Sequence, residues 1–274
     1  MSPDESPHLS SNALALEARE EILDMTHRAN ASHVGSALSV VDILAVLYSG
    51  GANISPKNLE DVDRDIVILS KGHSAAALYA VLGLKKFFPL DWLSDYSGNA
   101  APLGGHVTSR GVPGVELSTG SLGHGLPYGL GIALSRLRKG IGGHVFVVMS
   151  DGECDEGTTW ESAMIASHHG LKNLTVIIDR NGIQSLASTE QTLALEPFAE
   201  KWRAFGWDVI ESSGHDHEQL LNSLISDVKP RCLIANTVKG KGIDFMENSV
   251  LWHYKSPSKE DLEKAKTLLE VNYP

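Results

Sequence analysis

The chain has 274 residues, of which 42% are hydrophobic, 21% are charged and 26 are glycine. This length and composition allow a sizeable core and exclude the disordered and fibrous classes of protein. The formal net charge of -11 excludes nucleic acid or an anionic membrane surface as the main partner, because such surfaces require clustered Lys and Arg. The two cysteines, Cys154 and Cys232, lack CxxC spacing, so neither a disulfide framework nor a zinc site is predicted.

The N-terminal stretch MSPDESPHLSSN is polar and acidic, without the apolar centre of a signal peptide. No stretch of the chain approaches 18 continuous apolar residues. We therefore expect a cytoplasmic protein with two free thiols and no membrane partner.

Short apolar and β-branched runs alternate with helical patterns along the chain. The runs predict strands at 65–70, 144–150, 174–179, 207–212 and 231–237. Helices are predicted near 12–30, 39–49, 73–87, 123–139, 158–170, 193–205, 215–228 and 258–271. Continuously apolar strands indicate a parallel sheet with helices on both faces, in one α/β domain spanning 1–274. The Gly/Pro-rich segment between these elements, at 90–120, is too long for an idle connection and is expected to line a site.

Two of the predicted strands end in polar side chains that suit a metal ion. The strand at 144–150 leads into Asp151 and Gly152, and the strand at 174–179 is followed by Asn181. A right-handed crossover would place Asp151 and Asn181 side by side at the carboxyl edge of the sheet. Their oxygens, with a backbone carbonyl such as that of Ile183, suit Mg²⁺ completed by water and a diphosphate. The alternative is that both side chains merely cap helices or turns.

An acidic run, ECDE at 153–156, follows the first of these strand ends. Glu153 and Asp155 are expected to form a solvated first turn that complements the dipole of the following helix. A capping box from Thr158 to Glu161 is predicted to begin that helix.

The span from Asp151 to Asn181 resembles the thiamine diphosphate motif of transketolases, which begins Gly-Asp-Gly and ends with Asn after a strand. Ser150 replaces the first glycine here, and the metal-binding Asp is retained. The resemblance covers nearly the whole chain. It is to the N-terminal, diphosphate-binding part of transketolases, and specifically to the small subunit of split, two-chain enzymes.

Four histidines lie in segments that match this family in the family's order. NASHVGSALS implies that His33 contacts the donor ketose, and SKGHSAAALY implies that His73 lies near the cofactor diphosphate and the reacting carbon. GGHVT supplies His106, similar to the histidine that meets the ketose hydroxyls. KGKGIDFMENSVLWHY resembles the segment that brings a histidine, here His253, to the diphosphate and substrate. The resemblance therefore implies a catalytic set of four histidines.

Further contacts to the cofactor are implied by the same resemblance. STGSLGHG looks like the loop whose backbone touches the aminopyrimidine, which assigns Gly120, Ser121 and Leu122. Gly152 belongs to the diphosphate motif, and Glu156 matches an acid that makes contacts across the cofactor-site interface.

The sequence departs from the family pattern at two positions near these motifs. His124 stands where many relatives carry glutamine, and Tyr254 stands where relatives often carry glycine. These departures put the role of His124 and the shape of the loop around Tyr254 in question. Lys239 and Lys241 receive no role beyond contact with a phosphate.

The resemblance implies thiamine diphosphate and Mg²⁺, or Ca²⁺ or Mn²⁺ in its place, as cofactors, and transfer of a two-carbon ketol unit from a ketose to an aldose. The glutamate that activates the cofactor belongs to a pyrimidine-binding domain that this sequence lacks. A separate partner chain is therefore expected, in a heterotetramer with two copies of each chain.

Other readings of the sequence remain open. A deoxyxylulose-phosphate synthase or a 2-oxo-acid dehydrogenase component would share the Asp-to-Asn motif, but the set of four histidines favours transketolase. A non-catalytic cofactor-binding module would keep the fold without turnover. A dinucleotide dehydrogenase is disfavoured because no strand precedes a GxGxxG pattern.

Overall fold

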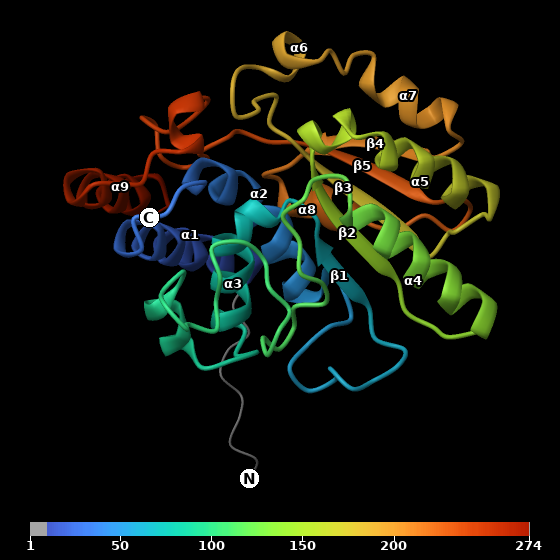
Figure 1. Ribbon diagram of the computed structural model, residues 1–274, viewed down its shortest axis with the longest axis horizontal. Coiled ribbons are helices and arrows are strands. Elements are labelled where there is room, and N and C mark those ends of the chain that lie inside the picture. Colours follow the sequence, from blue (N-terminus) through green and yellow to red (C-terminus); the bar gives the residue numbers. More distant parts are fainter. Residues whose placement is uncertain (1–9, 274) are drawn as a thin grey trace.

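The computed structural model describes residues 10–273, with a five-stranded sheet of order β1-β2-β3-β5-β4 at its centre (Figure 1). Each neighbouring pair is parallel. The strands are β1 (Ile66–Leu69), β2 (Val145–Ser150), β3 (Leu174–Arg180), β4 (Asp208–Ser213) and β5 (Arg231–Asn236). The five predicted strands and the α/β prediction are confirmed.

Helices lie on both sides of this sheet (Figure 1). One side carries α1 (Ser11–Arg28), α2 (Val34–Val46), α3 (Ala75–Leu84), α8 (His217–Ser223) and α9 (Lys259–Asn272). The other carries α4 (Gly125–Lys139), α5 (Gly157–His168) and α7 (Phe198–Ala204). Shorter turns are η1 (Leu47–Gly51), η2 (Gly72–Ser74), η3 (Leu90–Asp95), η4 (Asp151–Asp155), α6 (Thr189–Thr192) and η5 (Val250–His253).

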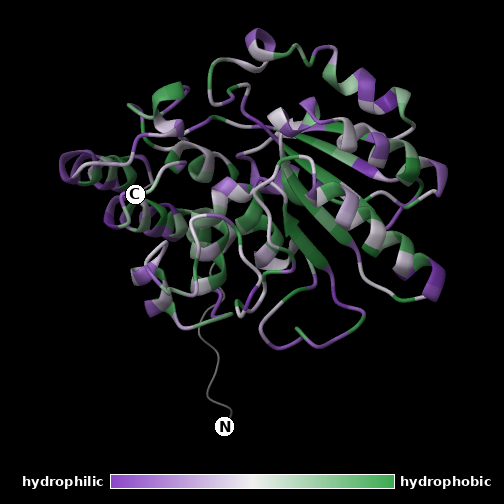
Figure 2. Cartoon of the chain, viewed as in Figure 1, coloured by the Kyte–Doolittle hydropathy of each residue, from purple (hydrophilic) through white to green (hydrophobic). Residues whose placement is uncertain are grey.

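Alternate residues of the central strands enter two separate cores. Phe146 and Val148 of β2 belong to the core with α1 to α3, whereas Val145 and Val147 belong to the core with α4 and α5. Figure 2 shows the apolar strands at the centre of the molecule. Burial on both faces explains why the strand sequences are continuously apolar.

The edge strand β4 departs from this pattern, because most of its residues are partly or fully exposed. Among the described strands it pairs with β5 alone. An edge strand with one neighbour has less need of a continuously apolar sequence, and β4 accordingly contains Asp208 and Glu211.

Two predicted helix starts and one predicted cap are wrong. The helix predicted at 193–205 begins five residues later, at Phe198 of α7. The helix predicted at 39–49 begins five residues earlier, at Val34, after His33 in a left-handed conformation with φ 74°. The backbone carbonyl of His33 accepts from the amides of the first turn, and no side chain caps them, so the usual sequence signal for a helix start is missing. The capping box predicted at Thr158 is also absent, because its hydroxyl donates to the carbonyl of Gly123 instead.

One window of the described chain, Val34–Gly51, is long and apolar enough to cross a membrane by length and composition, with a mean hydropathy of 1.5. Inside the structure 83% of that window is buried, and α2 packs between α1 and α3. Its apolar surface is thus covered by other helices of the same chain.

We predict a loss of stability in mild acid that depends on His144. Burial lowers the pKa of His144 to about 4, and its Nε2 donates to the Thr175 hydroxyl at 2.8 Å. Between pH 6.5 and about 4 the folded ring is neutral while the unfolded ring is protonated, so stability falls as the pH falls. His144→Gln should flatten the pH dependence of the unfolding free energy by about 1.4 kcal/mol per pH unit in this window, measured by urea denaturation. An unchanged slope in the variant would contradict the prediction.

Candidate active site

A cavity of about 240 Å³ lies at the carboxyl edge of the sheet, where the turns that follow β1, β2 and β3 meet the 239–254 segment. Its lining residues are His33, Ser36, Lys71, His73, Gly120, Leu122, Ser150, Asp151, Gly152, Asn181, Ile183, Gln184, Ser185, Lys239, His253 and Tyr254. Parallel strands present their carboxyl ends on one edge, so segments distant in sequence converge there.

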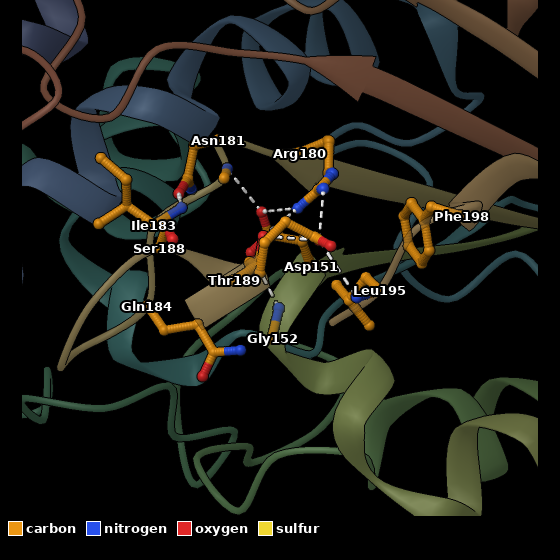
Figure 3. Close-up of polar contacts among 12 residues, drawn as sticks. Asp151, Gly152, Arg180, Asn181, Ile183, Gln184, Ser188, Thr189, Leu195 and Phe198 are labelled. Atoms are coloured by element: carbon orange, nitrogen blue, oxygen red, sulfur yellow. Dashed lines mark hydrogen bonds and ion pairs between the residues drawn. The ribbon is translucent and has the colours of Figure 1, made fainter. Parts of the chain in front are cut away.

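The crossover from β2 to β3 brings Asp151 and Asn181 into the same wall of this cavity (Figure 3). Asp151 is 2% exposed, and its Oδ2 accepts from the Gly182 amide at 2.7 Å while Oδ1 accepts from the Gly152 amide at 2.8 Å. The side-chain oxygen of Asn181 accepts from the Ile183 amide at 3.1 Å. The adjacency predicted for Asp151 and Asn181 is therefore present.

The three predicted metal ligands offer one carboxylate, one amide and one backbone carbonyl. Within residues 10–273 no group of three or more His, Cys, Asp or Glu side chains is arranged to hold a metal. The carbonyl of Ile183 accepts from the Lys239 ammonium at 3.1 Å. Hard oxygens on one cavity wall fit a metal that takes its other ligands from water and a diphosphate.

Imidazole rings from four distant segments gather beside the cavity. The ring centroid of His33 lies 5.3 Å from that of His73, 5.6 Å from that of His106 and 5.1 Å from that of His253. The His33 amide also donates to the carbonyl of His253 at 2.8 Å. The histidines predicted from separate motifs thus form one cluster, although His106 is exposed and lies outside the cavity lining.

Burial keeps the rings that line the cavity neutral at physiological pH. It lowers the pKa of His33 to about 4 and that of His253 to about 3, with further lowering by the Lys239 ammonium. It also holds the pKa of His73 well below its usual value, together with the charge of Lys71. Neutral imidazoles each offer one donor and one acceptor nitrogen.

The remaining predicted contacts divide into two groups. Gly120, Leu122 and Gly152 line the cavity, as expected of backbone that approaches a ligand closely. Ser121 and Glu156 are exposed and lie outside the lining. Ser121 and Glu156 therefore do not contact a ligand that occupies this cavity alone.

The two positions that depart from the family pattern lie in different places. His124 is exposed at the start of α4, where its Nδ1 faces the carbonyl of Leu122 at 3.0 Å. Tyr254 lines the cavity although it is 62% exposed, and its ring centroid lies 4.7 Å from that of His253. Tyr254 thus forms part of the rim of the site.

Glu153 contradicts the expectation of a solvated acidic turn. Its side chain is 0% exposed and accepts from the Ser70 hydroxyl at 2.5 Å, the Ser150 amide at 3.0 Å and the Gly123 amide at 3.1 Å. Ser150 and Glu153 form a capping box at the start of η4. Glu153 therefore ties three of the segments around the site together.

A buried ion pair that the sequence reasoning missed lies at the cavity, which Lys71 helps to line. Lys71 and Asp179 are both 0% exposed and pair directly, and Asp179 also accepts from the hydroxyls of Ser39 and Thr237. Burial alone would raise the pKa of Asp179, but the Lys71 charge and these hydrogen bonds hold it below its usual value. The available signal was an Asp that ends the apolar run LTVIID.

Comparison with known proteins decides the family. The family model described as "Transketolase, thiamine diphosphate binding domain" matches residues 11–273. The chain belongs to this family. An apulose-4-phosphate transketolase subunit of Actinobacillus succinogenes is 39% identical over 94% of both chains. A 6-deoxy-6-sulfo-D-fructose transketolase subunit of a Clostridium species is 34% identical over 92% of this chain and 98% of its own.

Solved structures of transketolases share the fold. The transketolase of Campylobacter jejuni superposes with a TM-score of 0.88 at 28% identity, covering 94% of this chain and 42% of that one. The transketolase of Leishmania mexicana gives the same TM-score at 26% identity, covering 95% of this chain and 41% of that one. This chain thus spans about two fifths of the length of these transketolases.

We predict that Glu153 is a structural acid. Glu153→Ala leaves the Ser70 hydroxyl and the Ser150 and Gly123 amides without their acceptor, so it should lower the unfolding free energy by about 3 kcal/mol. Glu156→Ala, three residues away and exposed, is the matched control and should change it by less than about 0.5 kcal/mol. Equal stabilities of the two variants in urea denaturation would refute this role.

Proposed function

We propose that this chain is the cofactor-binding subunit of a two-subunit transketolase, which moves a two-carbon ketol unit from a ketose to an aldose. The observation that carries the proposal is one cavity lined by His33, His73 and His253 together with Asp151 and Asn181. This combination favours ketol transfer over the other thiamine diphosphate chemistries, which share only the Asp-to-Asn motif.

The cavity residues fit a diphosphate held through Mg²⁺. The Asp151 carboxylate, the Asn181 amide oxygen and the Ile183 carbonyl would hold the metal. Imidazole donors of His73 and His253 and the backbone around Gly152 would bind diphosphate oxygens. Thiamine diphosphate, when bound, supplies the carbanion chemistry of the reaction.

The imidazoles would orient the sugar and move protons. Because the pKa values of His33 and His253 are low, both rings are neutral at neutral pH and can each accept a hydrogen bond from a sugar hydroxyl. His106 stands beside His33 and faces solvent, a position suited to a sugar hydroxyl further from the cavity. The ring centroid of His33 lies 5.3 Å from that of His73 and 5.1 Å from that of His253, so each of these rings has another imidazole beside it.

A second subunit is part of the proposal. Two of the relatives that this chain matches nearly from end to end are named as subunits of a transketolase. The partner would supply the pyrimidine-binding half of the site and the acid that activates the cofactor, in an assembly with two copies of each chain. Ser121 and Glu156, which lie outside the cavity lining, would then contact the cofactor or the partner across that interface.

The proposed donor is an anionic ketose. Two relatives carry names that specify apulose 4-phosphate and 6-deoxy-6-sulfo-D-fructose, which are a phosphorylated and a sulfonated sugar. Among the described residues that line the cavity, Lys71 and Lys239 contribute ammonium groups, of which Lys71 is paired with Asp179, and Asp151, the predicted metal ligand, contributes the carboxylate. With that carboxylate assigned to the metal, these charges suit an anionic ligand better than a cationic one.

Ketol transfer should require both subunits. The assay uses thiamine diphosphate, Mg²⁺ and phosphorylated or sulfonated ketoses, first with this chain alone and then with the product of the neighbouring gene. Activity is expected only when both chains are present, because the activating acid would come from the partner. Activity of the lone chain would contradict the two-subunit proposal, and silence of the mixture with every sugar would contradict ketol transfer.

Asp151 should be required for metal-dependent cofactor binding. Asp151→Asn removes the charge of the proposed metal ligand, so thiamine diphosphate affinity in the presence of Mg²⁺ should fall by at least about 100-fold. Isothermal titration calorimetry measures the affinity, and circular dichroism checks the fold. Asp91→Asn, which changes an exposed acid of η3 outside the cavity lining, is the control and should retain binding. Tight binding by Asp151→Asn would remove Asp151 from the metal site.

A further inference from the structure

Arg180 is the last residue of β3 and reaches the proposed metal ligand from behind the cavity wall (Figure 3). Its Nη1 donates to Oδ2 of Asp151 at 3.3 Å and to the Thr189 hydroxyl at 2.7 Å. Oδ2 is the oxygen that also accepts from the Gly182 amide. Arg180 is absent from the cavity lining, so it contacts the metal ligand without contacting the cavity contents.

The guanidinium is held in this position from its other side. Its Nη2 pairs with Glu196 at 3.0 Å and with Glu190 at 3.4 Å, and its charge lies 5.3 Å from the ring centroid of Phe198. The side chain is 12% exposed, whereas Glu190 and Glu196 are 41% and 59% exposed. Water screens the two glutamates more than it screens the ion pair with Asp151.

The charges around the cavity are otherwise nearly balanced. Lys71 is matched by Asp179, and Arg180 pairs with Asp151 as well as with the two more exposed glutamates. The Lys239 ammonium has no carboxylate within ion-pair distance among the described residues, and its neighbours are two carbonyls and the His253 ring. Among the charged side chains that line the cavity, Lys239 is therefore the one without a carboxylate partner within the described residues, which favours an anion and opposes a lone divalent metal.

We propose that Arg180 is a positioning residue that makes metal binding conditional on the diphosphate. This inference rests on the proposed function, because it takes Asp151 as the metal ligand. The guanidinium shares the ligand carboxylate and repels a metal that arrives alone. A diphosphate brings enough negative charge to offset that repulsion, so the metal binds with the diphosphate and not before it.

The test measures Mn²⁺ affinity of the full chain, with free Mn²⁺ read by electron paramagnetic resonance, in the absence and presence of thiamine diphosphate. Arg180→Gln removes the charge and keeps a donor for Thr189 and Glu196. It should bind Mn²⁺ alone at least about tenfold more tightly than the native chain, and the gain in affinity caused by thiamine diphosphate should shrink by a similar factor. Arg180→Lys, which keeps the charge, should retain most of the native coupling.

Two further variants control the experiment. Arg203→Gln removes an exposed arginine of α7 that pairs with Glu200, and it should change neither affinity. Arg180→Met is the second charge-removing variant, and it replaces Arg180→Gln if that variant melts at a lower temperature than the native chain. The same changes in Mn²⁺ affinity and coupling are expected of it.

The outcomes separate this inference from the proposed function. Native-like Mn²⁺ affinity and coupling in the charge-removing variants would overturn the role of Arg180, even if Asp151→Asn still abolishes metal binding in the presence of thiamine diphosphate. Tight Mn²⁺ binding that survives Asp151→Asn in the Arg180→Gln background would place the metal elsewhere and overturn the proposed site as well. Tightened binding that is lost on adding Asp151→Asn supports both.

Discussion

The buried pair of Lys71 and Asp179 is the interaction on which the site depends. Lys71 follows β1 and Asp179 lies near the end of β3, with β2 between the two strands. Lys71 also donates to the carbonyl of Ser36 in α2, and Asp179 accepts from Ser39 of the same helix. One pair of charges therefore fixes two strand ends and a helix relative to one another. Removing either partner would leave an uncompensated buried charge, at a cost of about 3–5 kcal/mol.

This pair also shapes the chemistry of its surroundings. The Lys71 ammonium lies next to the cavity and lowers the pKa values of His33, His73 and His253, in addition to the effect of burial. A cation with its own buried partner can act on these rings while remaining fixed in place. Burial is the main cause of the neutral state of His33, His73 and His253, and the ammonium that holds the strand ends together adds to it.

The sequence predicts the frame of the molecule and the identity of most site residues. Short apolar and β-branched runs are specific enough to locate all five strands, including the less apolar β4, and the segment motifs identify His33, His73 and His253, which line one cavity. Local patterns fail where the partner of a residue lies far away in the chain. The sequence around Glu153 suggests a solvated acid because its partner Ser70 lies 83 residues away, and Arg180 matches no motif because its partner Asp151 lies 29 residues away. The start of α2 is missed because backbone geometry at His33, rather than a capping side chain, begins the helix.

The strand order has a consequence for how the chain is made. β5 lies between β3 and β4, and β4 pairs with β5 alone among the described strands. When β4 has just emerged from the ribosome it has no strand to pair with, because its partner β5 begins about twenty residues later in the chain. The first three strands can assemble earlier, but the His253 segment follows β5 in the chain. The sheet and the histidine cluster can therefore be completed only after β5 and the His253 segment have been synthesised, when β5 inserts between β3 and β4.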